Sequence, residues 1–130
     1  LKLKVDDMRK AGLSVRKVEY LVDLALQFDS GAIDVDAWQS MEDETIIAEL
    51  VGIRGIGRWT AEMFLIFHLM RPNVLPLDDV GLISGISHNY FSGEVVSRSD
   101  ARDVAVAWTP YCSVATWYIW RSLDPLPVAY

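Results

Sequence analysis

The most informative part of this sequence runs from Leu50 to Asp79 and reads LVGIRGIGRWTAEMFLIFHLMRPNVLPLDD. Its first part is rich in glycine, with Gly52, Gly55 and Gly57 close together. Each glycine destabilises a helix interior by about 1 kcal/mol relative to alanine, and glycine adopts positive φ without a steric penalty. The pattern therefore predicts a tight turn of bare backbone between two helices.

The residues after this turn predict a central helix from Arg58 to Met70. This segment is almost wholly apolar, which is typical of a helix buried on nearly every side. Pro72 is expected to end the helix, and Pro76 then leads the chain to the adjacent carboxylates Asp78 and Asp79. A glycine-rich turn, a buried helix and a pair of carboxylates are thus close together in the sequence.

The rest of the chain carries helix signals throughout. No stretch alternates with period two for long enough to predict a strand. Ser14, Asp34 and Asp43 are expected to cap helices, and Ser97 to Asp100 fits a capping box. We predict one all-α domain over residues 1–130. Besides the central helix, the expected helices cover 2–11, 15–28, 35–41, 44–51, 79–90, 97–108 and 111–123.

Composition limits the function classes. The chain has 130 residues and a formal net charge of −6, which argues against a broad basic face for nucleic acid. No uncharged run reaches the roughly 18 residues that a membrane span needs, so no membrane association is expected. Cys112 is the only cysteine, so an internal disulfide is excluded.

The glycine-rich turn is a candidate anion site. Gly55 and Gly57 expose backbone N–H groups just before a helix begins, and Arg58 adds a positive charge. The turn lacks the Gly-Lys-Ser/Thr of a nucleotide-binding loop and the strand that precedes a dinucleotide site. Its form suits one backbone phosphate of DNA, and the alternative is a simple turn between helices.

Several segments of the chain resemble a known family. Residues 50–61 resemble the helix-hairpin-helix of DNA base-excision glycosylases, and residues 76–79 resemble the proline-containing loop and catalytic aspartate of that (HhH-GPD) superfamily. Residues 11–17, 58–61 and 108–111 are similar to its alkylpurine branch, 3-methyladenine DNA glycosylase II. The family fold has two lobes and carries further helices before Lys2, so the chain is expected to be an N-terminally truncated, C-terminal part of it.

The resemblance implies an activity. It implies hydrolysis of the N-glycosidic bond of alkylated purines, such as 3-methyladenine and 7-methylguanine, in double-stranded DNA. Asp79 would be the catalytic carboxylate, which activates water or stabilises the oxocarbenium ion. Lyase-competent relatives carry a lysine at the position of Trp59, so an aromatic residue there implies a monofunctional enzyme. No cofactor is required, and the expected location is the bacterial cytoplasm, with action on the nucleoid.

The resemblance also implies which residues form the site. The base pocket is expected to contain Trp59, Met63, Tyr111 and Asp78. Contacts to DNA are expected from Gly52, Arg54, Gly55, Gly57, Arg58 and Thr60. Backbone carbonyls of Val51, Ile53 and Ile56 would hold a structural Na⁺ or K⁺.

Plainer interpretations stay open. Asp79 can be no more than a helix N-cap, and Trp59 and Tyr111 can be core residues. Trp117 and Trp120 are expected to serve packing rather than the pocket. The alternative function is a catalytically weakened or inactive helix-hairpin-helix module for DNA binding or oligomerisation. A homo-oligomer that covers the face left by the missing N-terminal part is also expected.

Overall fold

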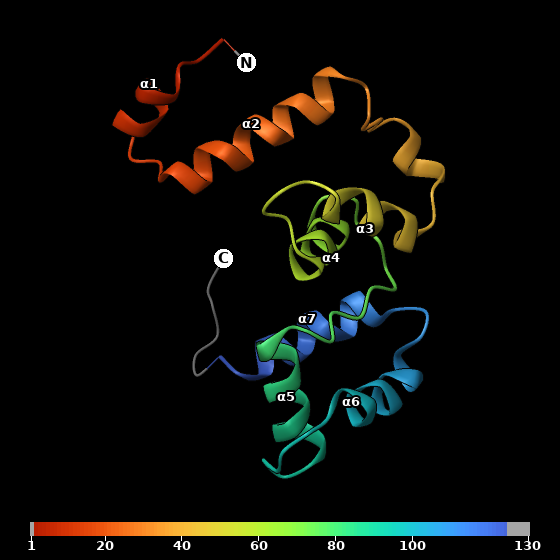
Figure 1. Ribbon diagram of the computed structural model, residues 1–130. Helices are drawn as coiled ribbons and strands as arrows, with labels where there is room; N and C mark the ends of the chain where they lie inside the picture. Colours follow the sequence, from red (N-terminus) through yellow and green to blue (C-terminus); the bar gives the residue numbers. More distant parts are fainter. Residues whose placement is uncertain (1, 125–130) are drawn as a thin grey trace. The chain divides into compact units, whose positions relative to one another are not determined.

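The computed structural model describes residues 2–124, and within that range it contains helices and no strand (Figure 1). The prediction of an all-α fold is confirmed. The chain divides into two compact units, Leu1–Ala61 and Glu62–Tyr130, and each is described by itself. Among the described residues, no helix is both long and apolar enough to cross a bilayer.

The first unit contains four helices and the beginning of a fifth. Ser14 caps the long second helix, because its Oγ accepts the backbone N–H of Lys17 at 3.3 Å. The first two helices pack against each other. The elements are α1 (Val5–Lys10), α2 (Val15–Asp29), the 3-10 helix η1 (Ala37–Ser40), α3 (Asp43–Val51) and the start of α4 (Arg58–Phe67).

Two of the expected caps in this unit are wrong. Asp34 does not cap a helix over 35–41, because its Oδ1 accepts the N–H of Asp36 at 3.1 Å and closes a turn instead. Only the 3-10 helix η1 follows that turn. Asp43 lies inside α3, whose N-cap is Glu42. In both places aspartate was expected to cap a helix, but it also closes local turns and is accepted in a first helical turn.

The second unit contains the rest of α4, followed by α5 (Val80–Tyr90), α6 (Arg98–Ala105), the 3-10 helix η2 (Val106–Trp108) and α7 (Cys112–Ser122). Helix α4 ends at Phe67 rather than Met70. The N–H of Leu69 bonds to the carbonyl of Phe64 at 3.1 Å, and Met70 adopts a φ of 55°. The helix is therefore closed by a left-handed C-terminal turn before Pro72 is reached.

Helices α5, α6 and α7 surround the core of the second unit, with α5 packed against both of the others. The core cluster consists of Leu82, Ile86, Val96, Ala101 and Ile119. Val80, the first residue of α5, lies outside this core and is 82% exposed. The capping box of Ser97 and Asp100 is present and begins α6, as predicted.

The segment that leads to the two aspartates is fastened to the start of α7. The Oγ of Ser113 donates to the carbonyl of Arg71 at 2.6 Å and accepts the N–H of Val74 at 2.9 Å. The N–H of Ser113 also donates to the carbonyl of Pro72 at 2.9 Å. These bonds fix the path of the chain just before Asp78 and Asp79.

Candidate active site

Asp79 is the N-cap of α5. Its Oδ1 accepts the backbone N–H of Leu82 at 2.6 Å, and the residue is only 9% exposed. The plainer interpretation of Asp79 as an N-cap is therefore correct as a description of its local structure. It is incomplete, because the same oxygen has a second donor from another helix.

That second donor is the indole N–H of Trp120, which lies in the last turn of α7 and donates to Asp79 Oδ1 at 2.8 Å. The ring of Trp120 stacks on Phe67, with centroids 5.9 Å apart and planes 15° apart. Three helices of the second unit thus meet around one carboxylate oxygen. Trp120 was expected to serve packing alone, and its hydrogen bond to Asp79 was not predicted.

Asp78 has a different environment. Its Oδ1 lies 2.5 Å from Nη2 of Arg98, the first residue of α6, and both side chains are partly exposed. A pocket of about 480 Å³ opens beside this ion pair and is lined by Asp78, Asp79, Arg98, Val80 and Ile83 among others. Arg98 was not predicted to line a pocket with the two aspartates.

The other two members of the expected base pocket that lie in this unit are not in that pocket. Met63 is half-buried in α4. Tyr111 is 62% exposed and stands at the N-cap of α7, so it is not a core residue. Trp120 lies about 13 Å further along that helix at the usual rise per residue. Within this unit, Tyr111 and Asp79 are therefore at opposite ends of α7.

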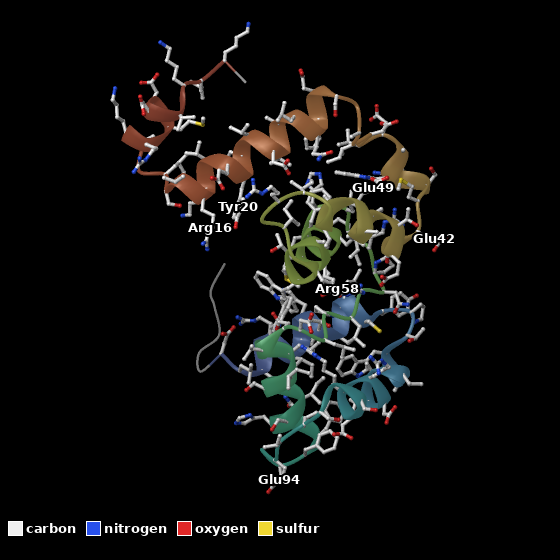
Figure 2. The ribbon with its side chains drawn as sticks, in the orientation of Figure 1. Arg16, Tyr20, Glu42, Glu49, Arg58 and Glu94 are labelled. Atoms are coloured by element: carbon white, nitrogen blue, oxygen red, sulfur yellow. The ribbon has the colours of Figure 1, made fainter. Side chains whose placement is uncertain are left out.

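The glycine-rich turn lies in the first unit, between α3 and α4. Gly55 has a φ of +89°, and a Cβ there would lie 2.3 Å from Cδ2 of Tyr20, which projects from α2 toward the turn (Figure 2). Ile53 is buried, and its carbonyl accepts the N–H of Ile56 at 3.1 Å. Around Gly57 nothing lies within 4 Å of a built Cβ, so its backbone is sterically open.

Both arginines of this turn have carboxylate partners. Arg58 donates to Glu44 through two nitrogens, at 3.0 and 2.6 Å, and this hydrogen-bonded pairing lowers the pKa of Glu44. Arg54 lies 3.4 Å from Glu19, and its backbone N–H donates to Asp23 at 2.8 Å. A phosphate would therefore compete with carboxylates for both guanidinium groups.

The remaining expected contacts also lie in the first unit. Trp59 and Thr60 lie in the first turn of α4, and both are exposed. Trp59 is 46% exposed, so it is not a plain core residue. Gly52 follows α3 as its C-cap. Among the described residues, no group of three or more His, Cys, Asp or Glu side chains is placed to hold a metal ion.

The chain is similar to known proteins over nearly its whole described length. No protein-family model matches the chain. A Bacillus subtilis protein provisionally named as a DNA-3-methyladenine glycosylase is 37% identical over 94% of this chain, which corresponds to 42% of that protein. The crystal structure of a DNA-3-methyladenine glycosidase from Bacillus halodurans superposes with a TM-score of 0.90 at 37% identity, over 95% of this chain and 57% of the other.

A Schizosaccharomyces pombe 3-methyladenine DNA glycosylase in complex with abasic DNA superposes with a TM-score of 0.81 at 30% identity, over 97% of this chain and 63% of that one. The chain belongs to the helix-hairpin-helix DNA glycosylases. The resemblance found in residues 50–61 and 76–79 is thereby confirmed. The chain spans about half the length of the relatives that it matches.

Proposed function

We propose that this chain carries the catalytic carboxylate of a DNA glycosylase that hydrolyses the N-glycosidic bond of alkylated purines. The observation that supports this most directly is the state of Asp79. In a chain related to DNA-3-methyladenine glycosylases, Asp79 is only 9% exposed, and one oxygen of its carboxylate takes two N–H donors. Such an arrangement holds an anion in one direction. We also propose the bacterial cytoplasm as its place of action.

The chemistry that we propose needs little from the protein besides a fixed negative charge. An N-alkylated purine carries a positive charge, so it leaves with the glycosidic electron pair as a neutral base. The sugar carbon C1′ becomes positive as the bond breaks, and the carboxylate of Asp79 stabilises that charge. A water oxygen then bonds to C1′, and its proton passes to the carboxylate or to solvent. The lesion nucleotide must leave the base stack to reach such a site.

Recognition of the base is proposed to use aromatic faces. A cationic ring gains roughly 0.5–2 kcal/mol from each aromatic face it lies against. Trp59 presents an exposed ring, and Met63 supplies a polarisable side chain. The ring of Tyr111 is exposed as well, but it lies at the opposite end of α7 from Asp79, so it would meet a part of the DNA away from the reacting sugar. Asp78 is held by Arg98 at the rim of the pocket beside Asp79, which suits a role in shaping that pocket.

Contact with double-stranded DNA is proposed through the turn between α3 and α4. The open backbone at Gly57 supports an approach by one phosphate. The carbonyl of Ile53 accepts one N–H and keeps a second lone pair. Together with the carbonyls of Val51 and Ile56, it would suit Na⁺ or K⁺, whose charge would help to hold the phosphate.

The test of this function is release of 3-methyladenine or 7-methylguanine from methylated duplex DNA. Wild-type protein is expected to release base, and Asp79→Asn is expected to lower the rate at least a hundredfold, on the order of what removal of one transition-state contact produces. Asp103→Asn, at an exposed position of α6, provides the matched control. No release by folded protein would remove the proposal.

A second function is favoured by the ion pairs at the turn. Because Arg54 and Arg58 both bind glutamates, and the net charge is −6, the chain can be a weakened or inactive module. This alternative predicts salt-sensitive DNA binding without base release. Gly57→Glu would abolish that binding, since it places a carboxylate where the phosphate must approach.

Self-association is a separate proposal. Helices α4 and α7 share an apolar face on the second unit, where Phe67, Met70 and Tyr118 are 60%, 74% and 65% exposed around a groove of about 450 Å³. Exposed apolar surface of this kind favours burial against another copy. Light scattering after size-exclusion chromatography is expected to give a dimer mass at micromolar concentration, and a monomer mass would contradict it.

A further inference from the structure

We infer that Trp120 and Gly81 are positioning residues for the Asp79 carboxylate. Gly81 leaves the space through which the indole of Trp120 reaches Asp79, and the indole N–H then fixes the direction of that carboxylate. The inference rests on the proposed function, in which Asp79 is the catalytic group. It assigns no contact with DNA to either residue.

The first observation is the space at Gly81. A Cβ built on this residue would lie 3.1 Å from Oδ1 of Asp79, and 3.2 and 3.3 Å from Cδ1 and Nε1 of Trp120. Oδ1 of Asp79 is the acceptor and Nε1 of Trp120 the donor of one hydrogen bond, and Cδ1 is the ring carbon next to that nitrogen. Any side chain at position 81 therefore presses on that bond, and its partners must shift by a few tenths of an ångström.

The second observation is the approach of the two helices. Gly85 lies one turn after Gly81 on the same face of α5. A Cβ there would lie 2.3 Å from Cγ2 of Ile119 and 3.1 Å from its carbonyl oxygen. Two glycines in a row along this face thus let α7 come close to α5 at Ile119. The residue after Ile119 is Trp120, and its side chain therefore lies against the N-terminus of α5.

The third observation is that Trp120 is held from another side as well. Its ring stacks on Phe67 at the end of α4. The direction of the indole N–H is therefore set by three helices rather than by its own rotamer. A hydrogen bond whose donor is fixed in this way can align a carboxylate for reaction, which a flexible donor cannot.

The N-cap bond alone would keep α5 folded without giving the same alignment. Leu82 N–H and Trp120 Nε1 both bond to Oδ1 of Asp79, one from within α5 and one from α7. Two donors from different directions restrict rotation of the carboxylate about its last torsion angle. Loss of the indole N–H is expected to leave the helix cap in place and to loosen that rotation.

The experiment compares Gly81→Ala and Trp120→Phe with wild type in single-turnover base release. Trp120→Phe keeps an aromatic ring beside Phe67 but loses the donor, and is expected to lower the rate constant about tenfold to a hundredfold. Gly81→Ala is expected to lower it roughly threefold to tenfold, with DNA affinity within about twofold of wild type. The matched controls His88→Ala, exposed on α5, and Trp108→Phe, elsewhere in this unit, are expected to retain the wild-type rate.

Stability separates positioning from a structural role. Alanine favours a helix over glycine by about 1 kcal/mol, so Gly81→Ala is expected to unfold at the same or a higher temperature while it reacts more slowly. The double variant is expected to be little slower than Trp120→Phe, because both changes act on one hydrogen bond. The inference would be overturned if the rate losses of the two single variants multiplied in the double variant. It would also be overturned if the rate of each variant fell in proportion to its thermal stability.

A second readout does not need activity. The indole ¹⁵N–¹H resonance of Trp120, assigned by its loss in Trp120→Phe, is expected to shift and to exchange faster with solvent in Asp79→Asn and in Gly81→Ala. It is expected to be unchanged in His88→Ala. If wild type releases no base, the proposed function fails, and this resonance alone decides the positioning contact. If Asp79→Asn is inactive while Gly81→Ala and Trp120→Phe react like wild type, the positioning inference fails and the proposed function stands.

Discussion

Two glycine sites in this chain bring side chains close to the backbone for different reasons. Gly55, in the turn between α3 and α4, lies under the ring of Tyr20 and has a φ of +89°. Gly81 and Gly85 lie in the regular helix α5, where neither has a positive φ, and they face Trp120 and Ile119. Gly55 is thus required by its own backbone and by a neighbour, whereas the other two are required by the neighbour alone.

The difference explains which of the two sites a sequence can reveal. A backbone requirement is local, and glycines that interrupt a helical pattern announce a turn at that place. A packing requirement depends on a partner far along the chain. Gly81 and Gly85 are spaced for one helix face, which indicates a close approach, but the spacing does not say that α7 is the partner.

The largest expected effect is at Gly85. Gly85→Val is expected to lower the free energy of unfolding by about 3 kcal/mol, because its side chain would overlap Ile119 and overpacking costs about 1–3 kcal/mol or occasionally more. Urea denaturation followed by circular dichroism measures it. His88→Val, on the exposed side of α5, controls for the β-branched side chain itself. A loss below about 1 kcal/mol would mean that α7 moves away easily and that the two helices are not tightly coupled.

At Gly55, the destabilisation due to the positive φ can be measured separately from that due to overlap with Tyr20. Gly55→Ala is expected to lower the free energy of unfolding by about 2 kcal/mol, the usual range for strained φ, with the overlap on Tyr20 included. In a double-mutant cycle with Tyr20→Ala, only the part due to overlap should disappear. Complete recovery in the double variant would show that φ contributes nothing there, and the contrast between the two glycine sites would be lost.

The sequence predicted what depends on neighbours in the chain. The all-helical fold, the cap at Ser14, the capping box at Ser97 and the turn around Gly55 all follow from local patterns, and all are present. The end of α4 was not predicted, because a left-handed turn at Met70 closes the helix before the proline that was expected to do so.

The site was predicted only in part. The sequence pointed to Asp78 and Asp79, since they follow a proline-containing segment and precede a helix. It did not reveal the bond from Trp120, the ion pair from Arg98 or the pairing of Arg58 with Glu44, because each depends on how separate helices meet. The positions of Trp59, Met63 and Tyr111 around a bound base stay a prediction.

Loss of the helix cap at Ser97 should reduce stability less than a substitution at either glycine site. Ser97→Ala is expected to lower the free energy of unfolding by about 1 kcal/mol, because the Oγ that accepts the N–H of Asp100 at 3.1 Å is lost from the N-cap. Ser99→Ala, two residues later in α6, is the control, and thermal unfolding measures both.

The pH dependence of the same variant tests the other half of the capping box. Hydrogen bonds from the side chain and backbone of Ser97 lower the pKa of Asp100 from its ordinary value of 3.8. Since the folded pKa is the lower one, the contribution is present above pH 3.8 and is lost as pH falls through the folded pKa. The difference in free energy of unfolding between wild type and Ser97→Ala should therefore become smaller in acid. A difference that does not change with pH would show that the Asp100 carboxylate does not contribute to it.

The smallest expected effect concerns the charges beside the glycine-rich turn. Glu44→Gln removes the partner of Arg58, an exposed pair of the kind that contributes about 0.2–1 kcal/mol. Stability at neutral pH should change by no more than about that amount. Without the Glu44 carboxylate as its competitor, a DNA phosphate should bind the Arg58 guanidinium more readily, so affinity for duplex DNA should rise about twofold to threefold and the salt dependence should steepen by about one phosphate contact. Fluorescence anisotropy over a range of salt concentrations measures both quantities.

Glu42→Gln makes the same charge change at the N-cap of α3, and Figure 2 shows Glu42 apart from Arg58. If both variants raise DNA affinity equally, the rise comes from the reduced net negative charge of the chain, which is −6 in wild type, and not from Arg58.

The pH dependence of DNA binding tests the same ion pair. Because Arg58 lowers the pKa of Glu44, the Arg58–Glu44 pair persists above the ordinary value of 4.5 and is lost as pH falls through the folded pKa. Wild-type DNA affinity should then rise toward that of Glu44→Gln only when the pH is brought below 4.5 and through the folded pKa, whereas the open backbone at Gly57 would bind phosphate equally at either pH. A gain on acidification in wild type that is absent from Glu44→Gln would assign the phosphate contact to Arg58 as well as to the glycine backbone.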